Sequence, residues 1–487
     1  MKKNNFLLFA ALMLSLTSCL KDLDVTQKSK LTGDGMWLTE SDATGALYGL
    51  MHQFRAANMV GLIYWGDYRA GTFQNGMGTG TCDKMFNNNL DATETKGTNW
   101  ASSYTCINDA NLILKHIPAM DLEDKALRNQ ILGSAYFIRA YEYFNIARVW
   151  GDAPLLLSGF ESDEDDLQPF RSPAGEIYDQ VLKDLDKAEN YLPESLSDAA
   201  MPNMMAVKML RADYFLWLYK TQNGGAEALK NARKALNNVL INSRIGLLDN
   251  YADIFDINKK GNKEVLFTIR MVKGEVEGGY STAWLIPQSR WYGKNNDDIE
   301  KNVKLMNSDD NRYNFSASLL ALMHGDPADT RTAVSYGDWT DPTDGRRYTW
   351  IDKFAGLWQD NVRYFVSDEP IYRYAEALLM MAEIELADGN YEKCRDYINQ
   401  VARRAYKKNG YYTSTAPADL KNALINEYLK EFTAEGKAWW MYIRMGEAFN
   451  RIPSLAGREG EKNILLWPIA SACFSENPNM RQTEGYK

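Results

Sequence analysis

The sequence predicts a mostly α-helical protein, a scaffold of antiparallel helix pairs like tetratricopeptide (TPR) repeats, with long irregular loops and a few short strands. Apolar residues recur at spacings of three and four along several long segments, which is the pattern of amphipathic helices. Pro and Gly residues, which end helices, separate these segments. Two segments also carry small and aromatic residues at the positions that TPR helices use.

The expected TPR-like helices lie in two groups, at about 104–240 and about 370–450. In the first group the helical pattern is clearest over 127–150, 174–192, 204–220 and 227–240. The match to a TPR second helix comes from Tyr178, Val181, Leu185, Ala188 and the closing Pro193. In the second group it comes from Ala382, Gly389, Tyr391, Cys394 and Ile398. Small residues let neighbouring helices approach while an aromatic ring fills the gap, so these positions predict paired helices.

Two long stretches interrupt the helices, at about 60–100 and about 241–366. The first is rich in Gly and Asn, and the second contains a strand-like segment, Val265–Ile269. Loops this long in a compact chain are usually functional or disordered, and their Trp and Tyr residues argue against disorder. We expect them to form ligand-binding loops within a single domain that spans 40–487.

The N-terminus has the pattern of an export signal over residues 1–18. Two lysines precede an apolar run that is too short to span a bilayer. Leu16-Thr17-Ser18-Cys19 then resembles the lipobox of bacterial lipoproteins, in which cleavage leaves a lipid-modified Cys, here Cys19, as the first residue. Residues 19–39 are expected to form the lipidated N-terminus and a tether, because two or more acyl chains anchor a protein stably. An ordinary signal peptide with a chance Cys is the alternative.

Charge and cysteine content exclude several classes of partner. The formal net charge is −9 at pH 7 and becomes more negative when the two signal-peptide lysines are removed. Nucleic acid is not an expected partner, because its phosphates would be repelled. Cys82, Cys106, Cys394 and Cys473 lack the close spacing of a zinc site. Export permits a Cys82–Cys106 disulfide, and buried free thiols are the equal alternative.

No catalytic residue, metal site or cofactor is predicted. His52, His116 and His324 are far apart, and the sequence contains no nucleophile elbow, zinc-binding helix or P-loop motif. The Gly-rich segment 76–81 has the wrong spacing for a phosphate loop and no following Lys, so we expect a flexible loop. The acidic run 161–166 lacks the Gly turn and closing Glu of a calcium loop, so we expect a solvated connector.

Five blocks between Trp100 and the C-terminus resemble the SusD/RagB family of outer-membrane nutrient-binding lipoproteins. They are NWASSYTCINDANLILKHIP, IRAYEYFNIARVWGDAPLL, FRSPAGEIYDQVLKDLDKAENYLP, DEPIYRYAEALLMMAEIELADGN and LLWPIASACFSENPNMRQTEGYK. The second block is the most specific, because it carries the family's RAYxYF and WGDxPL signatures. The resemblance implies the SusD-like α/α fold and a non-enzymatic surface protein of the outer membrane. Such a protein binds oligosaccharide and delivers it to a SusC-like TonB-dependent transporter.

One further block departs from the family pattern. EYLKEFTAEGKAWWMYIRMG keeps the family's Glu427, Glu431, Glu435 and Arg444. It lacks the arginines that usually follow the first Glu, and the usual Arg and Asp further on. We expect the aromatic packing of Trp439 and Trp440 to replace a buried salt-bridge network here, a change that is often neutral for stability.

A sugar site needs a flat ring for stacking and planar polar groups for adjacent hydroxyls. The two irregular stretches supply both, and the resemblance places the family's ligand loops in the first. The candidates are Tyr68, Arg69, Asn75, Tyr280, Trp284, Trp291, Tyr292 and Trp339. Arg69 has a second candidate partner in the Asp67 carboxylate. Aromatic residues of the helical motifs are expected in the core instead, namely Trp100, Tyr104, Tyr141, Tyr143 and Trp150.

Two other functions stay open. A surface scaffold for peptides or proteins would keep its partner after loss of the loop aromatics, because TPR-type grooves bind through helix faces. A glycan hydrolase would lose turnover on mutation of one carboxylate pair, and the abundance of acidic residues does not point to any particular pair.

Overall fold

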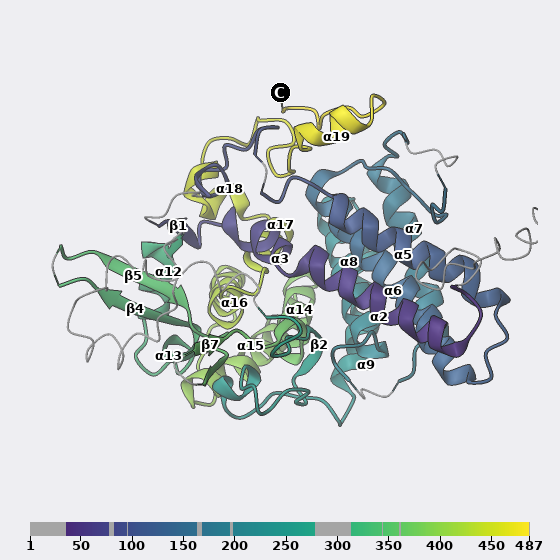
Figure 1. The fold of residues 1–487 in the computed structure, drawn as a ribbon. Coiled ribbons are helices and arrows are strands. Elements are labelled where there is room, and N and C mark those ends of the chain that lie inside the picture. Colours follow the sequence, from purple (N-terminus) through teal and green to yellow (C-terminus); the bar gives the residue numbers. More distant parts are fainter. Residues whose placement is uncertain are drawn as a thin grey trace, which may run out of the picture.

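The structure, a computed structural model, describes residues 36–76, 82–94, 96–162, 168–194, 198–277, 313–342, 344–359 and 362–486. Long helices form one side of the molecule and short strands gather in a lobe on the other side, at the left of Figure 1. The C-terminal segment crosses the top of the helical side (Figure 1). The export signal, Cys19 and most of the tether lie outside the described residues, as do most of the Gly-rich segment 76–81 and of the acidic run 161–166.

The first group of predicted helices is confirmed. Its members are α5 (Ala101–His116), α6 (Lys125–Trp150), α7 (Ala174–Tyr191), α8 (Met204–Thr221) and α9 (Gly225–Leu240). The predicted bounds of the last four differ from these by at most two residues. α6 packs against α5 and α7, and α8 packs against α9, while α2 (Glu40–Asn58) crosses α5 and α6.

Helix α6 lies at the centre of this side. Asp124 caps its N-terminus by accepting hydrogen bonds from the backbone N–H groups of Ala126 and Leu127. All residues from Phe137 to Trp150 are buried, so other elements cover the helix all round. It ends at Gly151, whose φ of +75° lies in the region that favours glycine.

The second predicted group is also confirmed, by α14 (Tyr374–Ala387), α15 (Tyr391–Tyr406) and α16 (Pro417–Glu431). α14 packs against α15 and α9, which joins the two groups. The shorter helices are α3 (Gly61–Ile63), the π-helix η2 (Tyr64–Tyr68), α4 (Asp83–Phe86), η3 (Ile117–Ala119), η4 (Tyr251–Ile254), α12 (Ala317–Met323), α13 (Thr332–Ser335), α17 (Ala438–Arg444), α18 (Ala448–Arg451), η5 (Pro453–Leu455) and α19 (Ser471–Glu476).

The described strands form four antiparallel pairs. They are β1 (Phe73–Asn75) with β3 (Tyr313–Phe315), β2 (Val265–Ile269) with β8 (Glu369–Arg373), β4 (Tyr336–Thr340) with β5 (Arg347–Ile351), and β6 (Leu357–Gln359) with β7 (Val362–Tyr364). β2 is the strand predicted at 265–269, and all its residues are buried. Since β8 leads directly into α14, the β2–β8 pair ties the irregular stretch to the helices.

The expected loss of the buried salt-bridge network is wrong. The carboxylates of Glu427, Glu431 and Glu435 pair with Arg331, Lys353, Arg373 and Arg404. All seven side chains are buried. The cations come from segments far from the motif, so the motif lacks its usual arginines while the carboxylates keep partners. Trp439 and Trp440 are buried as expected, but in addition to the network and not in its place.

The four cysteines in the described residues, Cys82, Cys106, Cys394 and Cys473, are buried free thiols, which decides between the two alternatives. Of the aromatic residues predicted in the core, Trp100, Tyr141, Tyr143 and Trp150 are buried and Tyr104 is partly buried.

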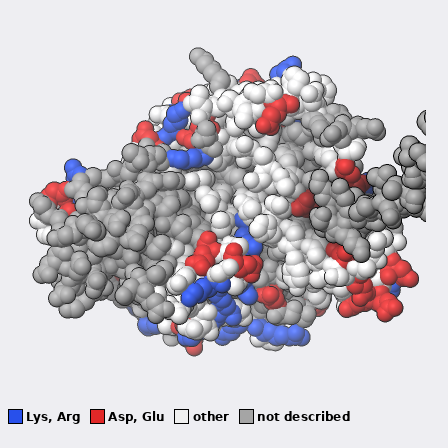
Figure 2. Space-filling model, viewed as in Figure 1, with Lys and Arg blue, Asp and Glu red and all other residues white. Residues whose placement is uncertain are grey.

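No helix within the described ranges has the length and apolar character needed to cross a membrane. These ranges also contain no group of three or more His, Cys, Asp or Glu side chains arranged to hold a metal ion. In Figure 2 a wide uncharged surface covers much of the centre of the face shown, with acidic and basic side chains mixed around it. The described part of this face thus shows mixed charge and no continuous basic surface for a polyanion.

Candidate functional site

An aromatic core supports the strand lobe, which we define as the β1–β3 and β4–β5 pairs. Phe73 of β1 packs against Tyr313 and Phe315 of β3, with ring centroids 5.1 and 4.9 Å apart. Phe315 in turn packs against Tyr336 of β4 at 5.6 Å. Because these rings interlock in edge and stacked arrangements, β1, β3 and β4 hold fixed positions relative to one another.

Tyr68, a predicted ligand residue, belongs to this core. Its side chain is fully buried at the end of η2, and its ring lies 5.3 Å from that of Phe73 and 5.0 Å from that of Phe86. A ligand could reach this ring only if the surrounding residues moved, so the structure gives Tyr68 a packing role.

Arg69, also predicted to bind ligand, is fully buried as well. Its Nη1 donates to the carbonyl oxygen of Leu466 at 2.7 Å, and its Nη2 donates to that of Ile464. The guanidinium lies 4.4 Å from the ring centroid of Trp439, and burial lowers the pKa of Arg69 to about 10. Arg69 therefore fastens the C-terminal segment to the start of the strand lobe.

Asp67, the partner suggested for Arg69 by the sequence, does not pair with it. Its carboxylate accepts hydrogen bonds from the backbone N–H groups of Gly436 at 2.8 Å and Ala438 at 3.2 Å, where α17 begins. Burial raises the pKa of Asp67 to about 7, although the two N–H groups oppose that effect. Asp67 and Arg69 therefore both stabilise contacts with the last fifth of the chain.

Asn75 is exposed at the end of β1, opposite Tyr313 of β3. Its Nδ2 donates to Oδ1 of Asp83, and the Nδ2 of Asn87 donates to the same oxygen at 2.9 Å. The three side chains form a polar surface group of amides and a carboxylate, which are the groups that bind hydroxyls through paired hydrogen bonds.

Trp339 is the one aromatic candidate of the second stretch that lies in the described residues, and its ring is partly exposed. It stands opposite Tyr348 in the β4–β5 hairpin, and the two rings stack with centroids 5.8 Å apart and planes 28° apart. Tyr348 and Trp350, which share a face of the hairpin, are buried. Trp350 occupies the space above Gly337, where a Cβ would lie 2.3 Å from its ring. Trp339, Tyr348 and Trp350 therefore lie together on one face of the hairpin, and Trp339 is the one that solvent can reach.

The opposite face of the hairpin carries an ion pair. Nε of Arg347 donates to Oδ2 of Asp338 at 2.9 Å, and both side chains are exposed. Alternate residues of a strand point to opposite faces, so this pair and the Trp339 ring lie on different sides of β4. The hairpin offers an apolar ring on one side and a charged, hydrogen-bonding pair on the other.

The structure separates the predicted site residues into three sets. Tyr68 and Arg69 lie in the core, and Asn75 and Trp339 lie on the surface of the strand lobe, in different sheets. Tyr280, Trp284, Trp291 and Tyr292 lie outside the described residues. The prediction missed Tyr348, although the turn sequence Asp341-Pro342-Thr343-Asp344-Gly345 is typical of a hairpin and would have placed it opposite Trp339.

Paired helices with a side lobe of short, aromatic-lined strands define a helical scaffold protein. Residues 70–211 match the family model described as "Starch-binding associating with outer membrane", and residues 280–486 match the model of the SusD family. The two matches together span most of the chain. The chain belongs to the SusD/RagB family.

Relatives cover the chain almost completely at low identity. SusD-like protein P38 of Formosa agariphila is 25% identical, over 97% of this chain and 96% of its own length. The starch-binding protein SusD of Bacteroides thetaiotaomicron is 23% identical, over 99% of this chain and 98% of its own length. The structure of NanU from B. fragilis superposes with a TM-score of 0.81 at 26% identity, over 95% of this chain and 100% of that one.

Proposed function

We propose that this protein is a non-enzymatic receptor for oligosaccharide that acts at the outer surface of a bacterial outer membrane. In this proposal Cys19 carries the lipid anchor, and the receptor passes its ligand to a SusC-like TonB-dependent transporter. Membership of the SusD/RagB family supports the proposal, as does the starch-binding relative. A tethered receptor raises the local concentration of ligand at the transporter, so weak individual contacts suffice.

The observation that carries the proposal is the partly exposed Trp339 ring, stacked on a buried Tyr348. A sugar ring presents an apolar face of C–H groups, which packs against a flat aromatic ring. Because Tyr348 already fixes the Trp339 ring, little side-chain entropy is lost when a ligand binds. We assign the ligand surface to the strand lobe, with Asn75 and Trp339 as described members and Tyr280, Trp284, Trp291 and Tyr292 as further candidates.

The proposal is tested with protein that lacks residues 1–19. Binding of a panel of purified oligosaccharides, starting with maltooligosaccharides, is measured by calorimetry, and released sugar is assayed in parallel. We expect at least one oligosaccharide to bind without product. We expect Trp339→Ala to weaken that binding by about 1–3 kcal/mol, roughly 5- to 150-fold, as expected for loss of one good stacking contact.

Tyr48→Ala is the matched control, because Tyr48 is an aromatic residue that is 63% exposed on α2, away from the strand lobe. The Tyr48→Ala variant should bind the oligosaccharide with the same affinity as the unaltered protein. Release of product would identify an enzyme, and the receptor proposal would then be abandoned. Equal affinity of Trp339→Ala and Tyr48→Ala would remove Trp339 from the site.

A further inference from the structure

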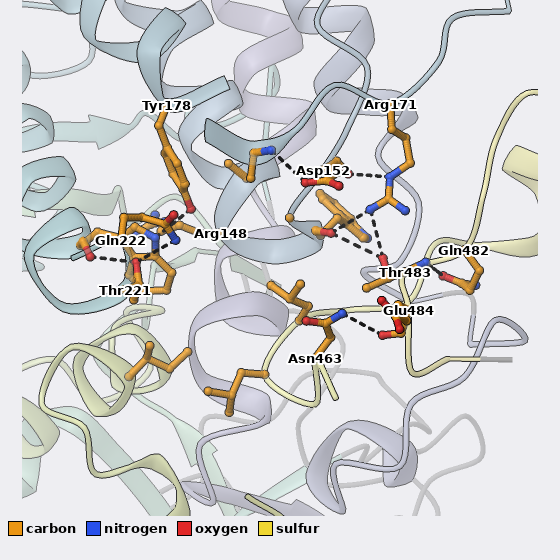
Figure 3. A pocket seen from close by; sticks show the side chains of 18 residues that line it. Arg148, Asp152, Arg171, Tyr178, Thr221, Gln222, Asn463, Gln482, Thr483 and Glu484 are labelled. Atoms are coloured by element: carbon orange, nitrogen blue, oxygen red, sulfur yellow. Dashed lines mark hydrogen bonds between the residues drawn. The ribbon is translucent and has the colours of Figure 1, made fainter. Parts of the chain in front are cut away.

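A cavity lies on the helical side, away from the strand lobe. It has a volume of about 490 Å³ and forms where the C-terminal end of α6 meets α7, α8 and the C-terminal segment (Figure 3). Small-molecule sites are typically clefts of about 300–1,000 Å³. None of the residues considered for the strand-lobe site lines this cavity.

Two backbone conformations shape the cavity. Gly151 has a φ of +75°, and a Cβ at this position would lie 3.0 Å from Cδ1 of Leu466. Asn463 has a φ of +55°, which is unfavourable for residues other than glycine, although asparagine tolerates it best. Such conformations persist where the surrounding structure holds them, and they concentrate at binding sites.

Aromatic side chains form part of the wall. Nε1 of Trp217 donates to Oη of Tyr178 at 2.9 Å, and this bond fixes both rings. Trp150 also lines the cavity, and its Nε1 donates to the carbonyl oxygen of Pro468 at 3.2 Å. Trp150 is fully buried and supports the wall from behind, whereas Tyr178 and Trp217 each keep 4% of their surface exposed. These two bonded rings form the rigid aromatic part of the cavity wall.

The two cations in the wall already have partners. Arg171 donates to the carbonyl oxygens of Asp152 at 2.7 Å and Trp150 at 3.2 Å (Figure 3). It also donates to the carbonyl oxygen of Arg481 at 2.9 Å. The terminal nitrogens of Arg148 donate to the side chains of Asp213 at 3.0 Å and Asn145 at 2.5 Å. Arg148 is already ion-paired with Asp213. The partners of Arg171 are neutral, but the Asp152 and Glu484 carboxylates line the same cavity and repel anions, so the wall disfavours carboxylates and phosphates.

Hydrogen-bond acceptors, in contrast, remain available. Asp152 uses Oδ1 to accept from the N–H of Ala174 at 2.8 Å, and Asn463 uses Nδ2 to donate to the carbonyl oxygen of Glu484 at 2.9 Å. Within the described chain no donor reaches Oδ2 of Asp152, Oδ1 of Asn463 or Oε1 of Gln222, and all three side chains line the cavity. A ligand that complements this wall must supply several hydrogen-bond donors.

Amines fit the wall less well than hydroxyls. The Glu484 carboxylate forms an ion pair with Lys462, and the Asp152 carboxylate lies close enough to Arg171 to raise the pKa of that arginine, although burial lowers it overall. The Glu484 carboxylate therefore already has a counter-ion, and the nearby Arg171 offsets part of the charge of Asp152. A charged amine would leave water for only a partial counter-charge.

We infer that this cavity is a second ligand site, for a neutral, hydroxyl-rich molecule of about one or two sugar units. Hydroxyl groups donate to Asp152, Asn463 and Gln222, and the ring C–H groups face the aromatic wall. The choice of a saccharide rests on the proposed function, whereas the cavity and its acceptors do not. The receptor would then hold one part of a glycan in the strand lobe and a small saccharide on the helical side.

The test uses protein that lacks residues 1–19 and three neutral disaccharides at millimolar concentration, maltose, cellobiose and lactose. 1,4-Diaminobutane is titrated as a cationic probe. The variant is Asn463→Gly with Gln222→Ala, which removes two acceptors while glycine keeps the backbone conformation at 463. We expect at least one disaccharide to bind, the double variant to bind it at least tenfold more weakly, and a crystal soaked with it to show it in the cavity. Thermal unfolding of the variant shows whether its fold is retained.

The Trp339→Ala variant separates the two proposals. If it retains the disaccharide binding that the double variant loses, the second site stands whatever the strand lobe binds. If it abolishes all binding while the double variant behaves like the unaltered protein, the strand-lobe proposal stands and the second site is rejected. The second site is also rejected if none of the three disaccharides binds, or if diaminobutane binds in their place.

Discussion

Glu142 is a single residue whose burial makes the stability of the protein depend on pH. It lies in the middle of α6, where Nδ2 of Asn58 from α2 donates to its Oε1 at 2.5 Å. Burial raises the pKa of Glu142 from 4.5 to about 7. Because the folded state binds this proton more tightly than the unfolded state, its contribution to stability is complete below pH 4.5 and is lost as the pH rises through 7.

We therefore predict that Glu142→Gln flattens the pH dependence of the free energy of unfolding between pH 5 and pH 8. The amide cannot ionise, so the variant avoids a loss of up to about 3 kcal/mol, since each unit of pKa shift corresponds to about 1.4 kcal/mol. Urea unfolding at several pH values measures the effect. Glu123→Gln, at an exposed position just before α6, is the control, and an equal slope in both variants would contradict the prediction.

Two of the predicted ligand residues, Tyr68 and Arg69, are buried because of contacts that the nearby sequence does not reveal. An Arg and a Tyr in a Gly-rich stretch resemble a sugar-binding pair, but the partners of Arg69 are carbonyl oxygens almost 400 positions later in the chain. No pattern in the neighbouring sequence predicts such contacts. Trp339 shows the opposite case, because its hairpin turn and its cross-strand partner lie within ten residues and are readable from the sequence.

Among the elements, α6 offers a direct test of helix capping. The Asp124 side chain accepts hydrogen bonds from two backbone N–H groups at the start of the helix. We predict that Asp124→Ala lowers the free energy of unfolding by about 1 kcal/mol, in a range of about 0.5–2 kcal/mol, because these N–H groups lose their acceptor. Asp121→Ala, at an exposed position outside the helix, should change stability much less, and chemical denaturation compares the two.

Helices were the most predictable elements, because their signal repeats within each segment. α6 to α9 follow the apolar periodicity to within two residues at each end. The π-helix η2 was not predicted, and its geometry depends on a distant segment. A Cβ at Gly66 would lie 1.9 Å from the carbonyl oxygen of Gly436, so this close approach requires glycine for reasons that lie about 370 positions away.

At the scale of the whole molecule, Glu431 joins three parts of the chain through ion pairs with Arg331, Arg373 and Arg404. Burial alone would raise the pKa of Glu431, but Arg404, Arg373 and Arg331 outweigh it and hold the pKa well below its ordinary value of 4.5. The charged form is thus the stabilising one. Its contribution is present above pH 4.5 and is lost as the pH falls through the lowered pKa.

We predict that Glu431→Gln destabilises the protein by about 3–5 kcal/mol at pH 7, because it removes the one carboxylate that three buried arginines share. Glu227→Gln is the matched control, since Glu227 pairs with Lys230 on the exposed face of α9 and such pairs contribute about 1 kcal/mol or less. Urea unfolding at pH 7 and pH 3 measures both variants. Similar losses in both, or a Glu431→Gln loss that does not shrink in acid, would refute the assignment.

The buried ion-pair network also shows what a sequence motif cannot predict. The motif around Glu431 lacked its usual arginines, so the sequence suggested that its charges had been replaced. The cations instead come from the N-cap residue of α13, from β8 and from α15, elements that are brought together only by the complete fold. A motif shows which of its own residues are kept, but not which distant residues serve as their partners.

The hydrogen bonds between Arg69 and the C-terminal segment have a consequence for the order in which the chain can fold. Arg69 donates to the carbonyl oxygens of Ile464 and Leu466, and the N–H of Trp467 donates to the carbonyl oxygen of Val149 at 2.7 Å. These partners lie almost 400 positions after Arg69 and more than 300 positions after Val149. The end of α6 and the start of the strand lobe therefore cannot reach their final packing until residues 464–467 have been synthesised.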